Sequence, residues 1–163
     1  MAKRVKINKK HVLCVKYAVC VVIEKDNKLL LLRRFNTGWK DGYYAFPAGH
    51  VEDDETFKQA AVRELGEESN LRAKENYLDL IHVVDVSSTS SQFRYFYLFF
   101  KCNKWFGEVK NNEPNKCDNL QWFDKKHLPR KFSPISFLAW KNIQKGSLYS
   151  EYGWKKNKEL RKS

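Results

Sequence analysis

A chain of 163 residues predicts a single domain, because domains usually contain about 100–200 residues. Hydrophobic residues make up 42% of it and aromatic residues 15%, which excludes a chain that is disordered throughout. The best candidate for a membrane helix, residues 17–23, is far shorter than the roughly 18 apolar residues that such a helix needs. The basic N-terminus is not followed by a secretory hydrophobic stretch, so we expect a soluble protein of the cytoplasm.

The formal net charge of +12 is concentrated at the two ends of the chain. Residues 1–16 contain six basic residues and no acidic one, and residues 141–163 contain seven basic and two acidic residues. We therefore expect one domain, 1–163, with basic extensions at about 1–15 and 147–163. Basic residues mixed with aromatic ones are typical of RNA-binding segments, but lysine-rich ends also serve as solubilising surfaces, and both interpretations stay open.

The chain contains four cysteines that are widely spaced and form no CxxC pair. A domain of this size does not need disulfides, so we expect reduced thiols that pack as small hydrophobic groups, as in a cytosolic protein. A zinc site is the weaker alternative, because the four histidines show no ligand spacing.

The N-terminal half contains two predicted strands joined by an Asp-Asn turn. Valine- and isoleucine-rich sequence over 12–24 predicts the first, and 29–34 predicts a buried second strand that ends in two arginines. A loop over 36–42 then leads to a short apolar segment at 44–46, which Pro47 ends.

An acidic helix follows. Thr56 and Gln59 have the spacing of a capping box, so the helix is predicted to start after Thr56 and to run to about Ser69. Asn70 suits the left-handed position that ends a helix.

The C-terminal half predicts a hairpin and a second helix. Strands are expected at 79–86 and 93–102 around a serine-rich loop, with a further short strand at 120–124. Pro134 is favoured at the first position of a helix, and Gly146 closes it. Hairpins combined with two helices predict a mixed α/β or α+β fold in one domain.

Three glutamates crowd one side of the acidic helix. At about 100° per residue, Glu64, Glu67 and Glu68 share an arc roughly 100° wide that borders the buried face. Like charges at this spacing repel each other on an isolated helix. A solvated acidic face is one interpretation, and a site for a hard cation such as Mg²⁺ or Mn²⁺ is the other.

The spacing around these glutamates favours the second interpretation. The segment resembles the Nudix box, Gly-x5-Glu-x7-Arg-Glu-U-x-Glu-Glu-x-Gly-U, where U is aliphatic. Eight of its nine specified positions are matched over 23 residues, namely by Gly49, Glu55, Arg63, Glu64, Leu65, Glu67, Glu68 and Leu71. The departure is Asn70, which stands where the family has glycine; since asparagine tolerates a positive φ, we expect the chemistry to be preserved.

The resemblance implies a fold, a cofactor and a set of catalytic roles. Nudix proteins are α/β/α sandwiches around a mixed sheet, and they hydrolyse nucleoside diphosphates linked to another group with Mg²⁺ or Mn²⁺. By position, Gly49, Glu64, Glu67 and Glu68 resemble the metal ligands. Glu64 and Glu67 also resemble catalytic residues, together with Arg63 and Glu55, which orient the carboxylates.

Residues outside the box are candidates for substrate binding. Arg33 and Arg34 end a strand, where only one of two neighbouring side chains can point inward. Glu113 is a candidate for a further ligand or base, and Asp118 for an acceptor from a purine edge; surface positions are the alternative for each.

The resemblance favours a Mg²⁺-dependent pyrophosphohydrolase of small nucleotides, with nucleoside triphosphates, cleaved to a monophosphate and pyrophosphate, as the first expectation. Hydrolysis of ADP-ribose or another nucleoside diphosphate sugar is a close alternative. Hydrolysis of RNA 5′ ends is a third, and a non-catalytic nucleotide-binding module is the alternative from another class. We expect a monomer or a homodimer.

Overall fold

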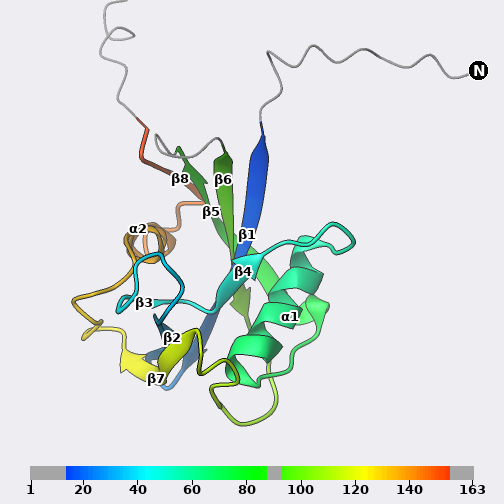
Figure 1. Ribbon diagram of the computed structural model, residues 1–163, viewed down its shortest axis with the longest axis vertical. Coiled ribbons are helices and arrows are strands. Elements are labelled where there is room, and N and C mark those ends of the chain that lie inside the picture. The colour runs from blue at the N-terminus through cyan, green and yellow to red at the C-terminus, as the bar shows by residue number, and fades with distance from the viewer. Residues whose placement is uncertain (1–13, 88–92, 155–163) are drawn as a thin grey trace, which may run out of the picture.

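The computed structural model describes residues 14–87 and 93–154, which form a mixed sheet between two helices (Figure 1). The strand order is β3-β2-β1-β6-β5-β8, with β4 paired to β1 and β7 paired to β2. In chain order the elements are β1 (Val15–Lys25), β2 (Lys28–Arg34), β3 (Tyr44–Ala45), β4 (Ala48–His50), α1 (Phe57–Ser69), a 3-10 turn (Glu75–Tyr77), β5 (Leu78–Val86), β6 (Arg94–Cys102), β7 (Cys117–Asp124), α2 (Pro134–Ile143) and β8 (Tyr149–Tyr152).

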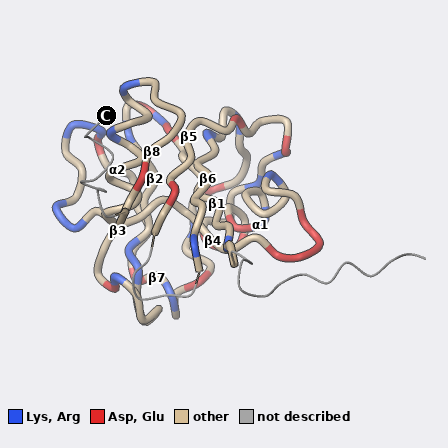
Figure 2. Tube along the Cα trace, turned by 90° about the horizontal axis from the view of Figure 1, so that it is seen from above, with Lys and Arg blue, Asp and Glu red and all other residues tan. Residues whose placement is uncertain are grey.

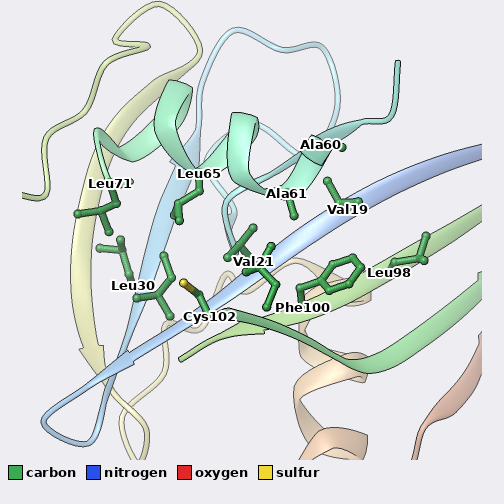
Figure 3. Packing of buried hydrophobic residues seen from close by; sticks show 12 residues of the cluster. Val19, Val21, Leu30, Ala60, Ala61, Leu65, Leu71, Leu98, Phe100 and Cys102 are labelled. Atoms are coloured by element: carbon green, nitrogen blue, oxygen red, sulfur yellow. The ribbon is translucent and has the colours of Figure 1, made fainter. Parts of the chain in front are cut away.

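The central strand β1 explains the layers. Successive side chains of a strand point to opposite faces, so its alternating apolar residues supply two cores. Val19 and Val21 pack with Ala60, Ala61 and Leu65 of α1 on one face (Figure 3). On the other face, β1 contributes to a second core that includes α2 residues. The expected α/β/α sandwich around a mixed sheet is therefore confirmed.

The ends of α1 follow the local sequence closely. The Gln59 backbone N–H donates to Thr56 Oγ1 over 3.2 Å, and the Thr56 N–H donates to Gln59 Oε1 over 2.8 Å, which completes the predicted capping box. Asn70 ends the helix with φ of 61°, in the left-handed region expected for it. Its side-chain amide also donates to the Glu108 carbonyl over 3.0 Å.

Replacing Asn70 by alanine is expected to lower the free energy of unfolding by about 1 kcal/mol, because alanine pays 1–2 kcal/mol in the left-handed region. This corresponds to a fall of about 2–4 °C in Tm for a chain of this size, measured by thermal unfolding. Asn70→Gly is the matched control and should lie closer to the wild type. Equal stability of the alanine and asparagine proteins would contradict the expectation.

Several boundaries differ from the sequence prediction. β7 begins at Cys117, three residues before the expected start, and β4 was not expected. Residues 149–152, assigned above to a basic extension, form β8 at the edge of the sheet. The predicted residues 12–13, most of the serine-rich loop and most of both predicted extensions lie outside the described residues.

All four cysteines are free thiols, and three of them are buried. In the part of the chain that the structure describes, no helix is long and apolar enough to cross a membrane.

Candidate active site

A cavity of about 1030 Å³ opens between α1, β4 and the inner strands of the sheet. This volume is at the upper end of the range for ligand sites in proteins. Among its lining residues are four glutamates: Glu64, Glu67 and Glu68 of α1, and Glu113 of the loop before β7. Figure 2 shows acidic positions along α1 and the loop that enters it, and both acidic and basic positions over the rest of the described chain.

Two of these glutamates lie directly against β4. Glu68 accepts a hydrogen bond from the Ala48 backbone N–H over 2.7 Å. The Glu64 carboxylate lies over Gly49, so closely that a Cβ atom at position 49 would overlap it. Glycine is needed at this point of β4 because the carboxylate occupies the space of a side chain.

Arg63 holds the cluster together through one guanidinium group. It donates to both carboxylate oxygens of Glu55, over 2.6 and 3.0 Å, and to the His50 carbonyl over 3.0 Å. It also donates to Glu64 over 2.7 Å and to Glu67 over 3.1 Å. These contacts raise the pKa of Arg63 above its usual value, and the Arg63 hydrogen bonds hold the pKa of Glu55 below its usual value. Of the two predicted orienting residues, Arg63 therefore contacts Glu64 and Glu67 directly, and Glu55 contacts Arg63.

Burial has the largest effect on the pKa values of Glu64 and Glu68. It raises the pKa of Glu68 well above the usual range, against the opposing effect of the Ala48 N–H. It also raises the pKa of Glu64, against the opposing hydrogen bond from Arg63. Desolvated carboxylates that also repel each other favour a bound cation.

Within the described ranges, no group of three or more His, Cys, Asp and Glu side chains is arranged to hold a metal ion. The donor set nevertheless fits one, because carboxylate and carbonyl oxygens are the ligands that Mg²⁺ and Mn²⁺ prefer. The space left open at Gly49 also lets Glu64 approach the β4 backbone. In the structure, Arg63 supplies the positive charge between Glu64 and Glu67.

The four predicted substrate-binding residues divide into two pairs. Arg34 and Glu113 line the cavity, and Glu113 forms an ion pair with Lys116 over 2.7 Å. Arg33 and Asp118 do not line it: the Arg33 guanidinium donates to both Asp118 oxygens over 2.7 and 2.9 Å. Strand alternation separates the two arginines, since neighbours in β2 point to opposite faces.

Arg34 is fixed by the loop that follows β2. It donates to the Trp39 carbonyl over 2.7 Å and to Thr37 Oγ1 over 2.9 Å, and its guanidinium lies 5.1 Å from the centre of the Trp39 ring. Asp41 stabilises the loop by accepting from the Thr37 and Gly38 backbone N–H groups. These contacts hold the positively charged Arg34 guanidinium at the wall of the cavity.

Aromatic residues of the cavity were not identified from the sequence. Tyr95 and Tyr97 of β6 line it, as does Tyr152 of β8. The alternation of Tyr95 and Tyr97 was a usable signal, because it places both rings on one face of a strand. No local pattern marked Tyr152.

Arg63→Lys is expected to lower kcat/KM on the nucleotide substrate by about 10–100-fold, because a lysine cannot span Glu55, Glu64 and Glu67 at once. The measurement is steady-state kinetics at saturating Mg²⁺. Arg72→Lys, an arginine outside the cavity, is the control and should remain at the wild-type rate. A fully active Arg63→Lys enzyme would show that the guanidinium does not orient the carboxylates.

Comparison with known proteins assigns this chain to a family. The profile of the NUDIX domain matches residues 15–141, and the chain therefore belongs to the NUDIX family. It is 36% identical over 124 residues to the ADP-ribose pyrophosphatase of Methanocaldococcus jannaschii, a match that covers 75% of this chain and 70% of that protein. It is also 44% identical over 55 residues to the CTP pyrophosphohydrolase of Escherichia coli K12, a match that covers 34% of this chain and 41% of that protein.

Solved structures agree on the fold. The MutT NUDIX hydrolase from Burkholderia pseudomallei superposes with a TM-score of 0.71 at 23% identity, covering 77% of this chain and 95% of that one. More particularly, the protein is a Nudix hydrolase, of a family that acts on pyrophosphate bonds. The resemblance found in the sequence is thus confirmed.

Proposed function

We propose that this chain is a divalent-metal-dependent pyrophosphohydrolase that cleaves the diphosphate of ADP-ribose or a similar nucleoside diphosphate sugar. The main supporting observation is that Gly49 and the three α1 glutamates line one cavity, which tyrosine side chains also line. The long match to an ADP-ribose pyrophosphatase supports this substrate over the nucleoside triphosphates expected first. Triphosphates are the second candidate, supported by the shorter match to a CTP pyrophosphohydrolase.

The chain's own residues have distinct roles in this reaction. Glu67, Glu68 and the Gly49 carbonyl would hold Mg²⁺ or Mn²⁺, with Glu64 as a further ligand or as the group that accepts a proton from the attacking water. When bound, the ion neutralises the diphosphate and lowers the pKa of a water molecule. Arg63 and Glu55 keep Glu64 and Glu67 oriented, and Arg34 binds a phosphate oxygen.

The location and further partners follow from the same proposal. A cytoplasmic enzyme would meet small nucleotides, and we propose that compartment, with a monomer or a homodimer as the active form. Hydrolysis of RNA 5′ ends stays a prediction, because most residues of the basic ends lie outside the described residues.

The test is a product assay by ion-exchange chromatography with Mg²⁺ over ADP-ribose, the four nucleoside triphosphates and a triphosphorylated RNA. We expect AMP and ribose 5-phosphate from ADP-ribose, with kcat/KM at least about tenfold above that for any triphosphate. Faster release of pyrophosphate from a triphosphate would establish the second candidate instead. Tight binding of nucleotides without any product would indicate a non-catalytic module.

A further inference from the structure

The last strand adds residues to the cavity from outside the family core. The NUDIX match ends at residue 141, whereas β8 spans Tyr149–Tyr152 and pairs in parallel with β5. Tyr152 and the following Gly153 both line the cavity. The family match therefore does not account for this part of its wall.

Buried side chains of β5 anchor β8. His82 contacts the Ser147 carbonyl through Nδ1 and Ser150 Oγ through Nε2, each over 2.8 Å. Asp85 accepts from the Tyr149 hydroxyl over 3.0 Å and forms an ion pair with Arg94. His82 and Asp85 are each only 1% exposed, so these polar contacts exclude water and hold the strand in one register.

The end of β8 is anchored as well. Trp154 donates from its indole N–H to the Asp85 carbonyl over 3.2 Å, and its ring lies 4.9 Å from the Arg94 guanidinium. Gly153 has φ of 79°, and a Cβ there would overlap the Ser87 carbonyl oxygen. The backbone of β8 thus meets the end of β5 too closely for any side chain at 153.

This register places two tyrosines on either side of a valine. Val86 of β5 is paired with Tyr95 of β6 on one side and with Tyr152 of β8 on the other. Residues paired across neighbouring strands share a face of the sheet. With strands about 4.8 Å apart, the two tyrosine backbones lie about 10 Å from each other, and the shorter valine forms the floor between them.

The three phenol groups of this side are available to a ligand. Among the described residues, the hydroxyls of Tyr95, Tyr97 and Tyr152 have no protein hydrogen-bond partner, and no side-chain nitrogen or oxygen that is sealed from solvent lacks one. These three tyrosines line the cavity, so their hydroxyls can bond to polar edges of a ligand bound there. The centre of the Tyr95 ring lies 6.1 Å from that of His50, the residue after Gly49. The tyrosines therefore adjoin the part of the cavity that contains the carboxylates.

We propose that Tyr95, Val86 and Tyr152 form the nucleobase subsite, in which the base stacks between the two tyrosines while the diphosphate lies at the α1 glutamates. This inference rests on the proposed function, because it assigns one part of that substrate. A planar, uncharged ring suits an aromatic slot with free hydroxyls, whereas the phosphates require the cation-binding side. β8 thus determines substrate specificity.

The test compares AMP with ribose 5-phosphate, which lacks the base, by isothermal titration calorimetry of the full chain in EDTA. Stacking of a base on aromatic side chains corresponds to a difference of about 5–150-fold in Kd. We expect the wild type to bind AMP at least about fivefold more tightly than ribose 5-phosphate. Tyr152→Ala should lose this difference, with an unchanged Kd for ribose 5-phosphate, and Tyr152→Phe should keep it.

Phe137→Ala is the matched control, because Phe137 is an exposed aromatic residue of α2 outside the cavity. Its AMP affinity should equal that of the wild type, and circular dichroism should show that all variants are folded. Equal affinities of the wild type for AMP and ribose 5-phosphate, or no AMP binding at millimolar concentration, would overturn the subsite. So would AMP binding that is unaffected by Tyr152→Ala.

Turnover of ADP-ribose with Mg²⁺, measured on the same samples, separates this inference from the proposed function. AMP binding that depends on Tyr152 in a protein without turnover would overturn the hydrolase proposal and support the subsite. Turnover in a protein whose AMP binding is independent of Tyr152 would support the hydrolase and overturn the subsite.

Discussion

Replacing Glu67 by glutamine is expected to lower kcat/KM for ADP-ribose by at least about 100-fold. Glutamine keeps the shape of the side chain and removes the negative charge that would help to hold Mg²⁺ and activate water. The Glu67 side chain is 52% exposed, and its one ion pair within residues 14–87 and 93–154 is with Arg63, so the free energy of unfolding should change by less than about 1 kcal/mol. Steady-state kinetics at saturating Mg²⁺ and thermal unfolding measure the two effects separately.

Glu75→Gln is the matched control for this change. Glu75 is an exposed glutamate of the 3-10 turn and does not line the cavity, so its replacement should leave kcat/KM within about twofold of the wild type. If Glu67→Gln is as active as Glu75→Gln, Glu67 takes no part in catalysis and the proposed mechanism is wrong.

Gly49→Ala is expected to lower kcat/KM by at least about 100-fold and also to destabilise the fold by about 1–3 kcal/mol. The added methyl group overlaps the Glu64 carboxylate, which must leave its place over β4. Its departure breaks the hydrogen bond with Arg63 in a partly buried cluster. Kinetics and chemical denaturation measure the two losses.

Two further variants make the Gly49 prediction specific. A Cβ at Gly66 of α1 lies in ordinary contact, 3.6 Å from the Leu71 carbonyl oxygen, so Gly66→Ala should stabilise the helix by about 0.5–1 kcal/mol. The double variant Gly49→Ala/Glu64→Ala removes the overlap and should recover part of the stability without recovering activity. A stable, active Gly49→Ala enzyme would contradict the observed contact between β4 and α1.

Local features of the sequence were sufficient for α1 and its glutamates. The capping box of Thr56 and Gln59 and the left-handed Asn70 involve residues within one turn of the helix ends, so their interactions can be predicted from spacing alone. The helical period likewise places Glu64, Glu67 and Glu68 on one side. The orienting roles of Arg63 and Glu55 were predicted only through the resemblance to the Nudix box, and the hydrogen bonds between these two residues, eight positions apart, were not predicted.

Contacts between distant segments were beyond such reasoning. Only the pairing of β2 with β7 shows that Arg33 meets Asp118 and that Arg34 remains for the cavity. β8 has no strong strand pattern, and its place beside β5 depends on His82 and Asp85, more than 60 residues earlier in the chain.

The sequence by itself determined the family, the mixed α/β class and the helix that carries the acidic cluster, because these depend on residue spacing within short segments. The tertiary structure alone decided which arginine lines the cavity, why position 49 must be glycine, and how β8 brings Tyr152 opposite Tyr95. The physical reason is that strand pairing and burial join segments whose separation along the chain leaves no local periodic signal.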